Sequence, residues 1–147
     1  MKVYLASPLF NDEETENHNK VLEVLKSKNL SVYAPMLNQY NQADFSKPEW
    51  ANKTFLKDIT EIQKCDIVVM IFYGLYSDSG TAWECGYAYG LGKPVICLHL
   101  HSGKSNVMIN CSSHASFRSI EELKDYDFNS LNKVNWYNFD VKFGVDK

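Results

Sequence analysis

The sequence predicts an α/β fold in which a doubly wound sheet of about five parallel strands carries helices on both faces. Short β-prone runs alternate with stretches of helical period, and this alternation is typical of right-handed β–α–β crossovers. The most apolar run, residues 66–73, is continuous rather than alternating, as expected for a strand covered on both faces. The 147 residues, 45% of them hydrophobic, are enough to form one domain, residues 1–147, around a sizeable core.

The first part of the chain contains two predicted strands and one helix. Residues 2–6 form the first strand, taken here as the central one, which ends before a proline that cannot donate to a β-ladder. Asn11 or Asp12 is predicted to cap the following helix, whose apolar stripe runs through residues 21–25. Residues 31–35 form the second strand, and the polar stretch after it is long enough to be functional.

A second helix is predicted for residues 48–64, because proline suits the first helical position. Phe55, Ile59 and Ile62 recur at helical spacing and should form its buried face. With about 3.6 residues per turn, Asp58 lies at the edge of that face, where a side chain can border a pocket.

Residues 78–90 follow the continuous apolar strand and should open a helix near Thr81. A carboxylate in the first turn of a helix is stabilised in its ionised form, so Glu84 is a candidate nucleophile or base. The alternative is that Asp78 only caps the helix and Glu84 only matches its dipole. Three small residues should let this helix pack closely on a sheet or on another helix: Ala82, Gly86 and Gly90.

The last third contains the fourth strand, residues 95–98, followed by a polar and irregular stretch. A short fifth strand is predicted for residues 115–118, and Ser119 with Glu122 resembles a capping box that opens a last helix. Residues 129–147 form an aromatic tail, which we expect to pack on the body or on a neighbouring subunit.

Charge and composition restrict the class of partner. The net charge of −3 and pI near 5.8 give no electrostatic footprint for nucleic acid or for an anionic membrane. The four cysteines lack Cys-x-x-Cys spacing, and neither an export signal nor a membrane-spanning run is recognised, so the sequence predicts a cytoplasmic protein. The expected partner is a small molecule or another copy of the chain.

Several common site types are excluded by their spacing. Gly103-Lys104-Ser105 lacks the preceding glycine and the following helix of a phosphate-binding loop. His99 and His101 have no third ligand at a recognisable spacing, so no metal is expected there. Cys85 has no paired histidine to activate it.

Carboxylate chemistry remains, at the edge of the sheet where the parallel strands end and where such folds bind ligands. Asp58, Asp78 and Glu84 are the candidate carboxylates, and Tyr4 on the first strand can orient one of them. Retaining glycosyl transfer needs one carboxylate to attack the anomeric carbon and a second group to protonate the leaving base.

Segments spread along the chain carry residues whose order and spacing together are specific. They are Val3-Tyr4-Leu5-Ala6 with Phe10, Asn38-Gln39-Tyr40, Trp50-Ala51 through Thr54 to Asp58, Asp78 to Glu84 with Gly86-Tyr87-Ala88, and Asn106-x-Met108. This pattern resembles the nucleoside 2-deoxyribosyltransferases over most of the chain.

The resemblance implies a flavodoxin-like fold and a double-displacement reaction. By analogy, Glu84 attacks C1′ of a 2′-deoxynucleoside and forms a covalent deoxyribosyl-enzyme, which a second base then attacks with overall retention. Tyr4 would orient Glu84, whereas Asp58 and Gln39 would face the nucleobase, with Asp58 as the proton donor.

The resemblance also implies how the sugar is held. Asp78 and Asn106 would bind its hydroxyls, and Phe10 and Gly80 complete the expected substrate contacts. Asn106 and Met108 would reach the site of an adjoining subunit, which makes a homo-oligomer, dimer-based and in this family often hexameric, part of the active site. No metal or organic cofactor is implied.

Two features depart from the family pattern. The chain continues beyond Phe143, where relatives often end in an aromatic residue whose terminal carboxylate reaches the site. The first loop carries Ser7-Pro8-Leu9 in place of the glycine and tryptophan that are frequent in relatives.

Two alternatives remain open. One is a 2′-deoxynucleoside 5′-monophosphate N-glycosidase, a hydrolase group that tends to carry serine where this chain has Asp78. An aspartate there would repel a 5′-phosphate, at a cost on the order of 1 kcal/mol even when the pair is screened by solvent. The other alternative is a non-catalytic nucleotide-sensing module, which would not need Glu84 and Tyr4 together.

Overall fold

The computed structural model describes residues 1–38, 47–75, 77–138 and 142–143. In this part of the chain a five-stranded sheet has the order β2-β1-β3-β4-β5, and every neighbouring pair is parallel. The strands are β1 (Lys2–Ala6), β2 (Ser31–Tyr33), β3 (Ile67–Phe72), β4 (Val95–His99) and β5 (Ala115–Phe117). The predicted parallel α/β sheet is confirmed. The central strand is β3 rather than β1, because the chain places β2 and β4 on opposite sides of the β1–β3 pair.

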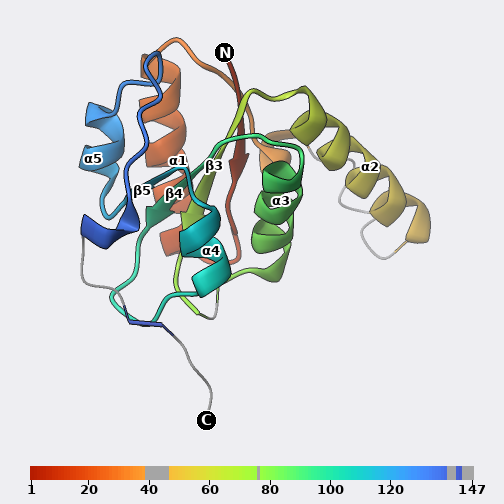
Figure 1. The fold of residues 1–147 in the computed structure, drawn as a ribbon. Helices are drawn as coiled ribbons and strands as arrows, with labels where there is room; N and C mark the ends of the chain where they lie inside the picture. Colours follow the sequence, from red (N-terminus) through yellow and green to blue (C-terminus); the bar gives the residue numbers. More distant parts are fainter. Residues whose placement is uncertain (39–46, 76, 139–141, 144–147) are drawn as a thin grey trace.

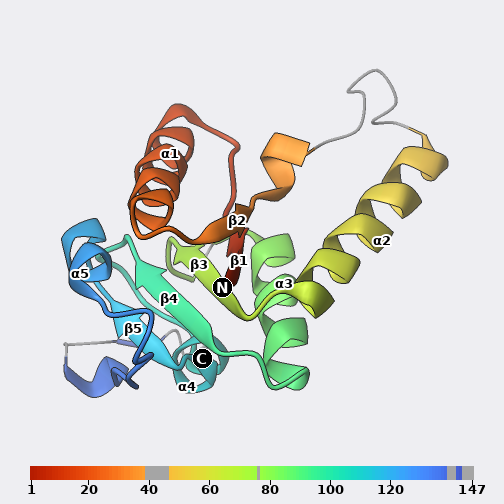
Figure 2. The ribbon, with the colours of Figure 1, turned by 90° about the horizontal axis from the view of Figure 1, so that it is seen from above.

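Helices cover both faces of the sheet (Figures 1 and 2). One face carries α1 and α5, and the other carries α2, α3 and α4, with α3 lying between α2 and α4. The helices are α1 (Asp12–Ser27), α2 (Pro48–Lys64), α3 (Ser79–Gly90), α4 (Val107–Ser112) and α5 (Ile120–Asp125). The described residues also include the 3₁₀ turns η1 (Pro35–Asn38) and η3 (Trp136–Asn138).

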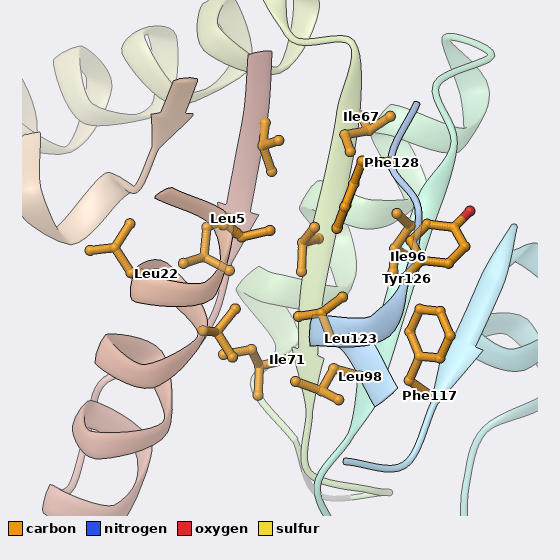
Figure 3. Close-up of a cluster of buried hydrophobic side chains, with 14 of the residues drawn as sticks. Leu5, Leu22, Ile67, Ile71, Ile96, Leu98, Phe117, Leu123, Tyr126 and Phe128 are labelled. Atoms are coloured by element: carbon orange, nitrogen blue, oxygen red, sulfur yellow. The ribbon is translucent and has the colours of Figure 1, made fainter. Parts of the chain in front are cut away.

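The core has two layers, one on each face of the sheet. Successive side chains of β1 point to opposite faces, so they enter the two layers in turn. Val3 and Leu5 join the cluster under α1 and α5, whereas Tyr4 and Ala6 join the cluster under α2 and α3. All six residues of β3 are buried, as predicted for a strand covered on both faces. Figure 3 shows the first cluster, in which aliphatic side chains of the sheet meet those of the helices.

Side-chain caps define where the helices begin. The Asn11 side chain accepts a hydrogen bond from the Glu14 amide, 2.9 Å long, and so caps α1. Ser119 caps α5 in the same way, with a bond of 3.1 Å from the Glu122 amide. Asp78 caps α3, which starts at Ser79 and not near Thr81.

Three expectations about the helices are wrong. In α2 only Ile62 is fully buried, and Phe55 is 50% exposed, because the first half of this helix extends beyond the sheet (Figure 2). The stretch read as irregular after β4 contains α4, which Asn106 caps. A Cβ added at Gly86 or Gly90 would meet no atom within 4 Å, so these two glycines do not pack closely on another described element.

The described part of the C-terminal tail lies against the body. Val134 forms a β-bridge with Ala115, and Phe143 forms one with Ser105, immediately before Asn106. The Trp136 ring contacts the Phe143 ring at 5.2 Å between centroids. Among the described residues, no helix has both the length and the apolar character that a membrane crossing requires.

Truncating the core should cost more stability than truncating the surface. Leu98 on β4 is completely buried, so Leu98→Ala should lower the free energy of unfolding by about 2–5 kcal/mol through lost burial and a residual cavity. Leu56→Ala on α2 is the matched control, since Leu56 is exposed, and should change it by less than about 0.5 kcal/mol. Urea denaturation measures both, and equal effects would contradict this description of the core.

Candidate functional site

Tyr4 and Glu84 form the centre of the candidate site. Tyr4 lies on β1 and is fully buried, and its hydroxyl donates a short hydrogen bond to Oε2 of Glu84 on α3. Burial, and then the negative charge of Glu84, raise the pKa of the Tyr4 phenol well above its usual range. The phenol therefore stays protonated and acts as a hydrogen-bond donor to the carboxylate.

The environment of Glu84 makes its ionisation unfavourable. Burial raises the pKa of Glu84 from 4.5 to about 7, the bond from Tyr4 opposes this rise, and the charges of Asp58 and Asp78 add to it. Because α3 begins at Ser79, Glu84 lies in the second turn, where the helix dipole has little effect. The expectation that the dipole ionises Glu84 is thus wrong, and desolvation is the larger influence.

Asp58 reaches the same region from α2. Its Oδ1 accepts a hydrogen bond of 3.2 Å from the hydroxyl of Tyr33, the last residue of β2. Burial raises the pKa of the Asp58 carboxyl, and the bond from Tyr33 opposes the rise. The Tyr33 ring also stacks on the Tyr4 ring, with 5.6 Å between centroids and 28° between planes.

Tyr33 is the residue of this cluster that the sequence reasoning missed. A usable signal was present, because β1 and β2 are both short strands that end before proline, and each carries a tyrosine. In the structure the two strands are neighbours and place Tyr4 opposite Tyr33.

A hollow of about 350 Å³ lies between α2 and α3 and reaches both carboxylates. Asp58 and Glu84 supply its acidic groups, and its walls are mainly apolar: Phe55, Ile59, Ile62, Gly80 and Trp83. Phe55 and Trp83 meet at 5.6 Å between ring centroids. A mostly apolar hollow with a few convergent polar groups is typical of a small-molecule site.

Asp78, Asn106 and Met108 line a different hollow. It has about 580 Å³ and lies between α3 and α4, on the far side of α3 from Asp58. Asp78 Oδ2 accepts two bonds of 2.8 Å from Thr81, one from the amide and one from the hydroxyl. Asn106 caps α4 by accepting a bond of 2.8 Å from the Met108 amide, and Met108 itself is 76% exposed.

Of the other two predicted substrate contacts, Phe10 lines neither hollow. Phe10 lies on the loop after β1 with 80% of its surface exposed, and its amide donates to Glu14 Oε1 over 2.8 Å. Gln39 lies outside the described residues, so the predicted base-contacting loop is not described beyond Asn38.

The two histidines at the end of β4 pack on each other and on Phe72. His99 Nδ1 and His101 Nε2 are 3.3 Å apart, and both rings meet Phe72 edge-on. Burial lowers the pKa of His99 to about 4, so it is neutral near pH 7. Within the described ranges, no group of three His, Cys, Asp or Glu side chains is arranged to hold a metal ion.

A family model and a solved structure both match this chain to one protein family. The family model for nucleoside 2-deoxyribosyltransferase matches residues 3–126. The structure also matches a solved 2-deoxyribosyltransferase from Bacillus psychrosaccharolyticus with a TM-score of 0.87 and 37% identity, covering 92% of this chain and 99% of that one. The chain belongs to the nucleoside 2-deoxyribosyltransferase family.

A curated relative agrees with this membership, and a further solved structure shares the fold. A nucleoside deoxyribosyltransferase of Lactobacillus leichmannii is 26% identical in an alignment of 140 positions that covers 86% of this chain and 89% of that protein. A Clostridium botulinum CMP N-glycosidase has the same fold, with a TM-score of 0.57 at 20% identity over 84% of this chain and 96% of that one. Membership in the 2-deoxyribosyltransferase family confirms the predicted family resemblance and the predicted enzyme class.

Removing the Glu84 charge should stabilise the protein at alkaline pH. Folding raises the pKa of Glu84 from 4.5 to about 7. The favourable contribution of Glu84 to the free energy of unfolding is therefore complete below pH 4.5 and is lost as the pH rises through 7. Glu84→Gln should therefore be more stable than the unmodified protein at pH 8, by on the order of 2 kcal/mol, and similar at pH 4.

Urea denaturation at both pH values measures this difference. Glu23→Gln, at an exposed position on α1, controls for the loss of one surface charge. Lower stability of Glu84→Gln at pH 8 would contradict the assignment of a costly buried charge.

Proposed function

We propose that this protein transfers 2-deoxyribose between nucleobases through a covalent ester on Glu84. The observation that carries the proposal is the buried Tyr4 phenol that donates to Glu84 at the wall of a hollow shared with Asp58. A carboxylate held by a permanently protonated donor has a fixed orientation, which a nucleophile needs. Family membership adds a second, independent support.

In the first step the Glu84 carboxylate attacks C1′ of a 2′-deoxynucleoside. The new bond joins a Glu84 oxygen to C1′, the glycosidic C–N bond breaks, and its electron pair goes to the departing base. Asp58 gives its proton to that base, so the base leaves neutral and Asp58 becomes a carboxylate. The raised pKa of Asp58 suits this role, since it keeps the proton available nearer to neutral pH.

In the second step a different base attacks C1′ from the face opposite to Glu84. The C1′–O bond to Glu84 breaks and returns the electron pair to the carboxylate, which Tyr4 stabilises by its hydrogen bond. Asp58 takes up the proton that the incoming base loses, so both carboxyls return to their starting state. Two inversions give overall retention at C1′.

We assign the remaining substrate contacts by the family resemblance, and the position of Asp78 supports its assignment. Asp78 lies at the start of the helix that carries Glu84, and its charge already acts on that residue. We assign Asp78 to the sugar hydroxyls, Gly80 to the hollow's rim, and Gln39 and Phe10 to the base. In this position Asp78 also disfavours a 5′-phosphate, which argues against the monophosphate hydrolase alternative.

We assign Asn106 and Met108 to the active site of a neighbouring subunit. Within one chain they lie across α3 from the hollow of Asp58 and Glu84. The surface beside them is apolar and exposed at Val107, Met108 and Tyr89, which is typical of a surface that another chain covers. A homo-oligomer would bring these side chains to a second copy's substrate.

The exchange reaction tests the proposal directly. Incubation with deoxyinosine and free adenine should yield deoxyadenosine and hypoxanthine, which liquid chromatography separates. Glu84→Ala should reduce the rate by about a thousandfold or more, because it removes the nucleophile. Glu23→Ala is the matched control and should leave the rate unchanged. Free deoxyribose as the only sugar product would favour hydrolysis instead of transfer.

Mixing two inactive variants tests the shared site. When equal amounts of Glu84→Ala and Asn106→Ala are refolded together, half of the subunit pairs contain one copy of each variant. In each such pair one site is intact, because it combines Glu84 from one copy with Asn106 from the other. Activity should then return to about a quarter of the refolded unmodified protein, by the statistics of a two-fold symmetric pair. A mixture no more active than the average of the two variants refolded separately would place Asn106 in its own chain's site.

A further inference from the structure

We infer that Tyr33 is a positioning residue, which holds Asp58 toward the hollow and sets how readily it exchanges a proton. The inference rests on the proposed function, in which Asp58 serves the leaving and incoming bases.

The geometry pairs the two tyrosines with the two carboxylates. Tyr4 donates to Glu84, and Tyr33 donates to Asp58, while the two rings stack on each other. Because Tyr4 and Tyr33 are opposite residues of adjacent parallel strands, the sheet fixes their spacing. The backbone of β1 and β2 therefore fixes where the two hydroxyl donors lie, one for each carboxylate.

The Tyr33 bond is long in the structure. Its 3.2 Å exceeds the roughly 2.8 Å of an ordinary O–H···O bond, and catalytic hydrogen bonds often tighten only when substrate is bound. The Tyr33 ring is stacked on a fully buried partner, so its hydroxyl has little freedom to leave Asp58. Tyr33 thus restricts which way the Asp58 side chain points.

Opposing influences act on the Asp58 carboxyl. Burial raises its pKa most strongly, and Glu61 adds to the rise, whereas Tyr33 and Lys57 lower it. Glu84 faces Asp58 across the hollow and interacts with its charge. A donor to the ionised form favours ionisation, so loss of the Tyr33 hydroxyl should make Asp58 release its proton less readily.

Tyr33→Phe tests this inference because it removes the hydroxyl and keeps the ring. Carbon-13 carboxyl resonances of labelled aspartate, followed against pH, report the Asp58 titration, and Asp58→Asn identifies its signal. In Tyr33→Phe the Asp58 titration should move up by about half to one pH unit, the equivalent of one lost hydrogen bond. The exchange rate should fall about fivefold to tenfold. The apparent pKa that Asp58 contributes to the pH–rate profile should rise together with the titration midpoint.

Tyr126→Phe is the matched control. The Tyr126 hydroxyl also donates one hydrogen bond, of 2.6 Å to the Asn132 carbonyl, but on the opposite face of the sheet. It should leave the Asp58 titration unmoved even if it lowers stability. The inference would be overturned if the midpoint of the Asp58 titration were unchanged in Tyr33→Phe. It would also be overturned if that midpoint moved while the exchange rate stayed the same.

The two proposals fail in different ways. The titration is measured without substrate, so it tests Tyr33 even if no exchange of bases is observed. Absence of exchange by the unmodified protein would overturn the proposed function alone.

Discussion

The hydrogen bond from Tyr4 to Glu84 ties the sheet to the helix on which the candidate site is built. It joins β1 to the second turn of α3, and it is made by a phenol that is completely buried. Burial raises the pKa of both partners, so the bond offsets part of the cost of keeping a carboxylate away from water. The arrangement of the other site residues follows from where this pair lies.

The parallel sheet determines which side chains can join the pair. Tyr4 faces the layer beneath α2 and α3, so only residues on that side of the sheet can reach Glu84. Asp58 borders the same hollow as Glu84 from α2, and Tyr33 on β2 donates a hydrogen bond to Asp58. Asn106 and Met108 lie across α3 from this hollow, which is why we assign them to a neighbouring copy.

Local signals in the sequence predicted the strands and the caps well. Prolines, apolar runs and the capping residues Asn11 and Ser119 act over a few positions, so they can be read without the fold. Long-range geometry could not be read in this way. The exposure of Phe55 depends on how far α2 extends beyond the sheet, and the role of Tyr33 depends on β2 pairing with β1. Sequence also gave no sign that α3 divides the predicted substrate contacts between two hollows.

The proposed reaction depends on a covalent bond between Glu84 and the sugar. Intact-protein mass spectrometry after rapid acid quenching, with deoxyinosine present and no acceptor base, measures this directly. A population heavier by one deoxyribosyl group should appear, located by peptide mapping on the fragment that contains Glu84 and absent in Glu84→Gln. A protein that exchanges bases yet carries no adduct, or carries it on another residue, would contradict a covalent intermediate on Glu84.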